Sequence, residues 1–201
     1  MISGYSIIGT GTDVGKTVVS AIVTKAIKGT YLKPLQAGDL SFTDADKVKM
    51  WCGKDVEVMP IQFKLTEPMA PHQAAKLDGV ELNIASIFIP NVERLVLEGA
   101  GGAMVPLNAR EYVLDIHKKA GLPVVLVSRN YLGSINHTIL TIQKLQSEGI
   151  EIAGIVYTGK ESMHTESIVT ETTGVQKILA FDFPTTIDEH FIAEKAKEIK
   201  L

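Results

Sequence analysis

The sequence has little of several features that mark specialised classes of protein. It contains a single cysteine, Cys52, so no internal disulfide can form, and this fits a reducing compartment. No apolar run approaches the ~18 residues of a membrane-spanning helix. Met1 to Tyr5 lack the basic and apolar regions of a signal peptide. We therefore expect a cytoplasmic protein without a membrane partner.

An excess of positive charge is also lacking. Twenty Lys and Arg residues against 23 Asp and Glu residues give a formal net charge of −3. Nucleic-acid-binding domains usually carry a basic surplus, so we expect no nucleic-acid partner. With 45% hydrophobic and 21% charged residues, the composition is that of an ordinary folded domain. We expect residues 1–201 to form one α/β domain.

Short apolar runs alternate with longer helical patterns along the chain. This alternation predicts a doubly wound, mostly parallel sheet flanked by helices. The expected strands are 5–8, 31–32, 95–97, 124–127, 152–157 and 178–179, and the expected helices are 15–28, 44–52, 133–147, 161–173 and 188–199. The stretch 56–91 is interrupted by Pro60, Pro68, Pro71 and Pro90. We interpret it as a loop-rich insertion within the domain, with a short helix near 72–77.

The strongest local signal is the segment GTGTDVGKT at 9–17. It follows an apolar strand and opens an amphipathic helix, which is the context of a phosphate-binding loop. Glycines let the backbone N–H groups turn toward phosphate oxygens, and the helix N-terminus adds partial positive charge. The expected nucleotide-binding residues here are Asp13, Val14, Gly15, Lys16, Thr17 and Val18. A glycine-rich turn followed by a fortuitous Gly-Lys-Thr is the simpler alternative.

The loop departs from two related patterns. Thr10 to Val14 separate Gly9 from Gly15, which is one residue more than in the usual P-loop motif. Regulatory switch ATPases of the deviant P-loop type carry an extra lysine early in the loop, where this chain has Thr10, Gly11 and Thr12. The second departure counts against a regulatory switch without excluding it.

Two acidic positions are candidates for holding Mg²⁺, which prefers oxygen ligands. Glu98 ends an apolar strand and precedes a glycine-rich turn, and ligands of open α/β sheets gather at the carboxyl ends of strands. An exposed acid at a strand end is the alternative. Asp44 precedes a helix, where an aspartate is often an N-cap, and Asp46 competes for either role.

Further polar residues have simpler interpretations. Lys33, taken alone, is a solubilising charge at a strand end. His117, His164 and His190 show no metal-ligand spacing and are expected at the surface. Trp51 is expected to pack in the interior.

The motifs taken together resemble a known family. The phosphate loop is followed by KPLQAG at 33–38, EPMAPH at 67–72, EGAGG at 98–102, VPL at 105–107 and LGSINH at 132–137. This order is similar to that of dethiobiotin synthetases. The phosphate loop and the EGAGG turn also occur in cobyrinic acid synthases, so the combination carries the resemblance.

The resemblance implies an ATP- and Mg²⁺-dependent ligase of biotin synthesis. Members of the family convert 7,8-diaminononanoate, CO₂ and ATP to dethiobiotin through a carbamate and a carbamic–phosphoric mixed anhydride. They are homodimers in which the partner subunit grips part of the substrate. The implied catalytic residues are Lys33, Lys16 and Thr12, and the implied metal ligands are Thr17, Asp44 and Glu98. The implied substrate contacts are Thr12, Lys33, Ala37 and Asn136, and the implied further nucleotide contacts are Asp44, Glu98, Gly99, Ala100, Gly101, Thr158 and Pro184.

Several positions depart from the family pattern. Ala37 stands where many members have a hydroxyl residue, and Asp13 replaces a common glutamate. Thr158 stands where members carry an Asn that reads the adenine, which leaves the base preference open. A P-loop switch ATPase and an accessory nucleotide-binding domain stay as alternative functions. Asn136 could instead cap a helix, and the neighbouring His137 could be buried.

Overall fold

Parallel pairing of short apolar strands builds the main sheet. The computed structural model describes residues 3–201, and in them a seven-stranded sheet has the order β4-β2-β6-β1-β7-β8-β9. Its strands are β1 Gly4–Gly9, β2 Thr30–Leu32, β4 Glu57–Val58, β6 Leu95–Gly102, β7 Val124–Arg129, β8 Ile152–Thr158 and β9 Lys177–Phe181. All pairings between them are parallel. The predicted α/β class with a mostly parallel sheet is confirmed.

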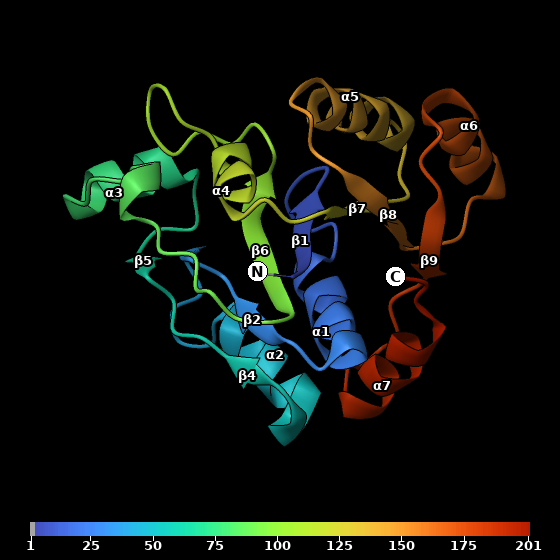
Figure 1. The fold of residues 1–201 in the computed structure, drawn as a ribbon, viewed down its shortest axis with the longest axis horizontal. Coiled ribbons are helices and arrows are strands. Elements are labelled where there is room, and N and C mark those ends of the chain that lie inside the picture. Colours follow the sequence, from blue (N-terminus) through green and yellow to red (C-terminus); the bar gives the residue numbers. More distant parts are fainter. Residues whose placement is uncertain (1–2) are drawn as a thin grey trace.

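Helices cover both faces of this sheet. The helices are α1 Lys16–Ile27, α2 Asp44–Cys52, α3 Pro71–Asp78, α4 Val113–Ala120, α5 Ser134–Ser147, α6 Met163–Thr173 and α7 Glu189–Glu198. Figure 1 shows α1, α2 and α7 on one face and α4, α5 and α6 on the other. On β1, Ile7 packs into the core under α1, whereas the next residue, Ile8, packs into the core on the opposite face. Because alternate side chains of a strand point to opposite faces, a continuously apolar strand suits a sheet buried on both sides.

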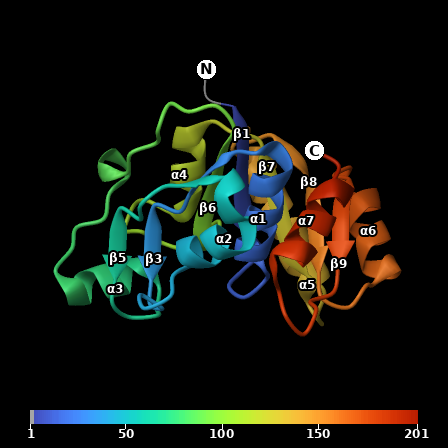
Figure 2. The same ribbon diagram turned by 90° about the horizontal axis from the view of Figure 1, so that it is seen from below.

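The segment 56–91 has more regular structure than the predicted loop-rich insertion. β4 joins the edge of the main sheet beside β2. β5 Phe63–Leu65 pairs in parallel with β3 Leu35–Ala37 to form a two-stranded sheet, and α3 covers it, as Figure 2 shows. Pro71 occupies the first turn of α3, where its missing N–H costs no hydrogen bond. The prolines here therefore begin and separate elements rather than prevent them.

Helix α4 is absent from the sequence-based prediction. It has only eight residues, and a polar residue, His117, lies on its buried side. The expectation that His117 lies at the surface is wrong: it is 1% exposed, and burial lowers its pKa to about 3. His117 packs against β6, since a Cβ at Gly99 would lie 2.5 Å from its Nε2 atom. Val113, Ile116 and Ala120 have helical spacing, so the pattern of α4 is present in the sequence, and only the interior position of His117 goes against its polar character.

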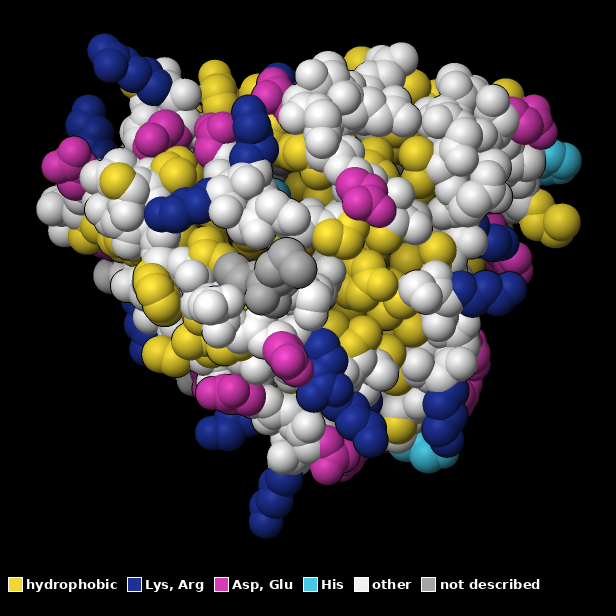
Figure 3. Space-filling view, viewed as in Figure 1, with side chains coloured by type: hydrophobic (Ala, Val, Ile, Leu, Met, Phe, Trp, Pro, Cys, Tyr) yellow, Lys and Arg dark blue, Asp and Glu magenta, His cyan; other side chains and the backbone are white. Residues whose placement is uncertain are grey.

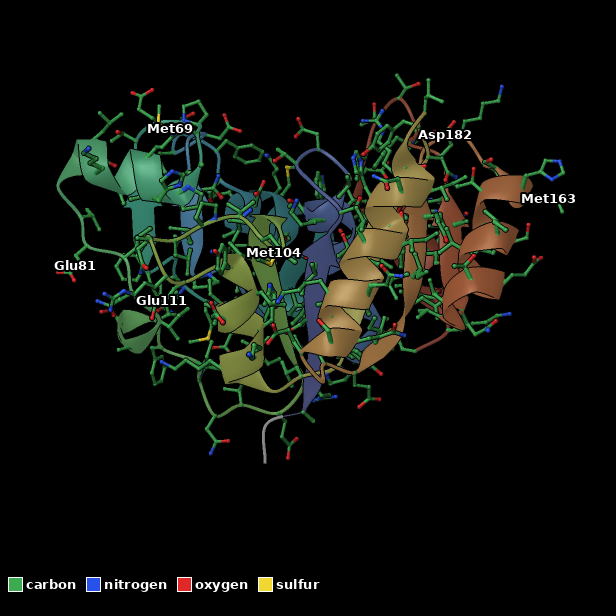
Figure 4. All side chains as sticks on the ribbon, turned by 90° about the horizontal axis from the view of Figure 1, so that it is seen from above. Met69, Glu81, Met104, Glu111, Met163 and Asp182 are labelled. Carbon is green, nitrogen blue, oxygen red and sulfur yellow. The ribbon has the colours of Figure 1, made fainter. Side chains whose placement is uncertain are left out.

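The carboxyl ends of the strands form one edge of the molecule. In Figure 4 the labelled Met69 and Asp182 lie at that edge, on either side of the loop that follows β1. On the face in Figure 3, acidic and basic side chains are interspersed rather than gathered by sign. Among residues 3–201, no helix combines the length and apolar character needed to cross a bilayer.

Candidate active site

The loop between β1 and α1 is held in a conformation that requires glycine. Gly15, which precedes α1, has a φ of 95°, in the left-handed region. A Cβ on Gly9 would lie 2.7 Å from Val14 Cγ2 and 2.9 Å from the Gly11 carbonyl oxygen. No side chain caps α1, so N–H groups of its first turn are available to an anion. The loop therefore has the backbone of a phosphate site.

Lys16 folds back over this loop. Its Nζ atom donates a hydrogen bond to the Gly11 carbonyl oxygen at 2.7 Å, and the residue is 7% exposed. Burial lowers the pKa of Lys16 to about 8, and the nearby Glu98 carboxylate opposes that shift. The ammonium group is thus poorly solvated, and an anion that entered the loop would stabilise its charged form.

This burial predicts a pH-dependent affinity for nucleotide. If phosphate binds to the charged form of Lys16, the affinity for nucleotide is expected to be full below about pH 8 and to fall about tenfold per pH unit above it. Calorimetric titration with ATP in EDTA between pH 7 and 9.5 measures the slope. Lys16→Arg, whose guanidinium keeps its charge, is expected to give a flat profile. A flat profile for the unmodified protein would contradict the prediction.

Lys33 lies between the two acidic candidates. Its Nζ atom contacts Glu98 Oε1 at 3.0 Å and also forms a short ion pair with Asp44. Burial opposes the charge on Lys33, but the carboxylates of Glu98 and Asp44 outweigh it and raise the lysine pKa. Although burial would raise the pKa of Asp44, Lys33 and then Lys47 lower it to about 2. Lys33 is therefore a buried cation held at the site, not the exposed charge of the alternative interpretation.

Glu98 is completely buried and lies within β6, not at its end as the sequence suggested, because β6 continues to Gly102. Thr17 Oγ1 donates to Glu98 Oε1 at 3.1 Å. Glu98 Oε1 thus contacts both Thr17 and Lys33, and Lys33 in turn contacts Asp44, which connects the three oxygen-bearing side chains. Such a set fits Mg²⁺, which needs few protein ligands when a nucleotide supplies others.

The two aspartates at the start of α2 have different contacts. Thr43 is the N-cap, and its side chain accepts from the Asp46 backbone N–H, while Asp46 Oδ2 accepts from the Thr43 N–H at 2.9 Å. Asp46 is thereby used in a capping box. The carboxylate of Asp44, two residues earlier, instead contacts Lys33.

These groups open into one cavity of about 930 Å³. It brings together most of the predicted site residues, namely Thr12, Asp13, Gly15, Lys16, Thr17, Val18, Lys33, Ala37, Asp44, Glu98, Ala100 and Gly101. It extends from Pro68 and Pro71 at one end to Arg129 and Phe183 at another. A pocket of this volume can hold a nucleotide and a second, smaller substrate together.

Other predicted residues lie outside the lining of this cavity. Val14 is buried in the core, and Thr158, fully buried, donates its hydroxyl to the Val14 carbonyl oxygen at 2.7 Å. Thr158 therefore supports the phosphate loop from behind. Pro184 is exposed beside Phe183, and Gly99 packs against α4.

The first turn of α5 lies apart from the cavity. Asn136 is exposed there and does not cap the helix, whose N-cap is Gly133. His137 is also exposed, so its alternative interpretation as a buried residue is wrong; its Nδ1 atom lies 2.5 Å from the Tyr131 hydroxyl.

Sequence reasoning missed several residues of the cavity wall. Arg129, at the end of β7, donates to the Asp13 carbonyl oxygen at 3.3 Å and lies 5.8 Å from the centre of the Phe183 ring. Trp51 packs in the core as expected, yet it also borders the cavity. The position of Arg129 at a strand end was the available signal for a site residue.

The sequence and fold are similar to those of known proteins. A family model described as "AAA domain" matches residues 3–189. The ATP-dependent dethiobiotin synthetase BioD of Christiangramia forsetii is 46% identical over 100% of this chain and 97% of its own length. The protein of that name from Lawsonia intracellularis is 40% identical over 91% of this chain and 89% of its own length.

A solved structure of the cell division ATPase MinD from Pyrococcus furiosus superposes with a TM-score of 0.62. It covers 98% of each chain at 13% identity, and this likeness shows the P-loop ATPase fold alone. The identity to the synthetases extends over nearly the whole chain and over nearly the whole length of each relative. This chain belongs to the dethiobiotin synthetase family.

Proposed function

We propose that this protein uses ATP to close the ureido ring of dethiobiotin from 7,8-diaminononanoate and CO₂, a step of biotin synthesis. One observation carries the proposal beyond family membership: Lys33 lines the same cavity as the phosphate loop and Lys16. The extra lysine of a switch ATPase lies early in the phosphate loop, whereas Lys33 follows β2 and faces the loop from across the cavity, where a second anionic reactant could bind between it and Lys16.

The proposed reaction joins two anionic reactants, a carbamate and the γ-phosphate, and the two lysines suit both. One substrate amine adds to CO₂ and loses a proton, giving a carbamate. A carbamate oxygen attacks the γ-phosphorus and ADP departs; the second amine then attacks the carbamoyl carbon, and phosphate departs as the ring closes. Lys16 and Lys33 would hold the two anionic reactants close together and stabilise the charge that develops between them.

Mg²⁺ is the metal that the oxygen ligands fit best. Thr17, Asp44 and Glu98 would hold it beside the terminal phosphates, where it would neutralise part of the phosphate charge. In the unliganded arrangement the Lys33 ammonium contacts both carboxylates. With Mg²⁺ bound to the two carboxylates, the Lys33 ammonium would be free to contact the carbamate.

The remaining residues divide between the two ends of the cavity. Asp13, Val14, Gly15 and Val18 would contact the phosphates mainly through the backbone. Gly99, Ala100 and Gly101 would allow close approach of substrate or nucleotide, with Thr12 and Ala37 near the diamine. The nucleoside end would lie toward Phe183 and Pro184, with Thr158 supporting the loop from behind.

A homodimer would complete the substrate site. Tyr131 and Ile135 expose apolar side chains around the first turn of α5, and Leu132 is 103% exposed. Asn136 lies on the same turn, whose N–H groups suit the carboxylate of a partner's substrate. We also infer that the chain forms one α/β domain. We infer a cytoplasmic location as well, because the reaction consumes ATP.

The decisive experiment is a product analysis. We expect incubation with diaminononanoate, bicarbonate and MgATP to give a product with the mass of dethiobiotin and one phosphate per ring. Phosphate release is expected to need both the diamine and bicarbonate. Slow release that is independent of both would favour the switch-ATPase alternative instead. Repeating the incubation with each nucleoside triphosphate gives the base preference.

A further inference from the structure

Tyr31 is a buried residue whose hydroxyl contacts the proposed metal ligand Glu98. It is 0% exposed, it is not among the residues that line the cavity, and its hydroxyl donates to Glu98 Oε2 at 2.8 Å. We propose that Tyr31 is a positioning residue: it anchors one oxygen of Glu98 so that the other faces Thr17 and Lys33. The inference rests on the metal role proposed above for Glu98.

Strand register explains why these side chains meet. β2 and β6 pair so that Tyr31 lies opposite Val96 and Leu32 opposite Leu97. Side chains alternate between the faces of a strand, so Tyr31 and Lys33 project from the same face. Glu98 is two residues beyond Val96 and projects from that face as well. Tyr31, in β2, and Lys33, just after its end, therefore approach the carboxylate from positions two residues apart.

The two oxygens of Glu98 are divided between different partners. Oε1 accepts from Thr17 Oγ1 at 3.1 Å and from Lys33 Nζ at 3.0 Å, and both donors line the cavity. Oε2 accepts from Tyr31, which lies behind the site. Among the described residues no other donor reaches Oε2. Without Tyr31 the carboxylate would have a fully buried, unpaired oxygen and would be free to turn it toward Thr17 or Lys33.

Tyr31 is suited to a permanent donor role. Burial, and then the neighbouring Glu98 and Asp44 carboxylates, raise the pKa of its phenol well above the usual value. A hydrogen bond to a buried charged group is also among the stronger ones in proteins.

The test separates metal-dependent from metal-free nucleotide binding. Titration calorimetry with the β,γ-imido analogue of ATP is run with Mg²⁺ and, separately, with EDTA. Tyr31→Phe keeps every ring carbon, so the fold is expected to persist. We expect its affinity with Mg²⁺ to fall about tenfold and its affinity in EDTA to stay within about twofold. Equal losses under both conditions, or no loss, would overturn the proposal.

Tyr157→Phe is the matched control. Tyr157 is 1% exposed, and its hydroxyl has no hydrogen-bond partner within residues 3–201. Removing that hydroxyl costs no hydrogen bond to the site, so both affinities are expected to stay unchanged. Loss of the Mg²⁺-dependent affinity in this variant would mean that any buried Tyr→Phe change disturbs the site, which would also overturn the proposal.

A second variant links the effect to Glu98. Glu98→Gln is expected to lose the Mg²⁺-dependent affinity, and adding Tyr31→Phe to it should cause little further loss, because the hydroxyl acts through the carboxylate. If Glu98→Gln binds as the unmodified protein does, the metal role of Glu98 fails. If Glu98→Gln loses affinity and Tyr31→Phe does not, only the role of Tyr31 fails.

Discussion

Dethiobiotin formation is expected to fall by about 10³-fold when Lys33 is replaced by alanine. The variant removes the cation that would stabilise charge between carbamate and γ-phosphate. It leaves the phosphate loop intact, so affinity for nucleotide should persist. Product mass and phosphate release, measured with saturating diamine, bicarbonate and MgATP, check the catalytic loss. Calorimetric titration with the β,γ-imido analogue of ATP checks the binding.

The ion pairs of Lys33 also predict how the same variant binds Mg²⁺. Without its ammonium group, the carboxylates of Asp44 and Glu98 lose a shared cation. Their attraction for Mg²⁺ should therefore be undiminished or stronger. If Lys33→Ala bound nucleotide more weakly in the presence of Mg²⁺, the role of Lys33 would be to position Asp44 and Glu98 and not to stabilise the transition state.

Lys47→Ala gives the matched control for Lys33. Lys47 also contacts Asp44, at 3.0 Å, but it is 28% exposed and does not reach Glu98. Its removal is expected to lower turnover less than tenfold, because a partly exposed ion pair contributes little. Turnover of Lys33→Ala within tenfold of the unmodified enzyme would remove Lys33 from the chemistry.

The second large effect is expected at Glu98. Glu98→Gln has nearly the same shape but no charge, so it should retain much of the packing of β6. We expect the gain in nucleotide affinity that Mg²⁺ brings to be largely lost and turnover to fall at least a hundredfold, roughly the cost of losing one transition-state contact. Binding in EDTA should be unchanged or tighter, since a buried anion near the phosphates has been removed.

Titration of Mg²⁺ against turnover at fixed ATP is the measurement for this variant. The apparent Mg²⁺ requirement should rise, while Asp46→Ala, which alters only the cap of α2, should leave it unchanged. An unaltered Mg²⁺ titration in Glu98→Gln would refute the metal assignment. A thermal melt of each variant distinguishes loss of the site from loss of the fold.

Much of the fold could be predicted because its signals are local. The apolar runs of β1 and β7 and the helical spacing of α1 each depend on neighbouring residues only. The apolar residues of α4 have helical spacing, so this helix was accessible to sequence reasoning, whereas the interior position of His117 depends on the packing of the helix on β6. β3 and β5 are too short to be recognised before they pair with each other.

The phosphate loop was determined by the sequence itself. From Gly9 to Thr17 the residues are contiguous, and the need for glycine comes from local backbone geometry. The pairing of Lys33 with Glu98 and the anchoring of Glu98 by Tyr31 were decided only by the tertiary structure. Those contacts join residues 65 and 67 positions apart, and the register between β2 and β6 brings them together. Register depends on how whole strands pack, and no short stretch of sequence contains that information.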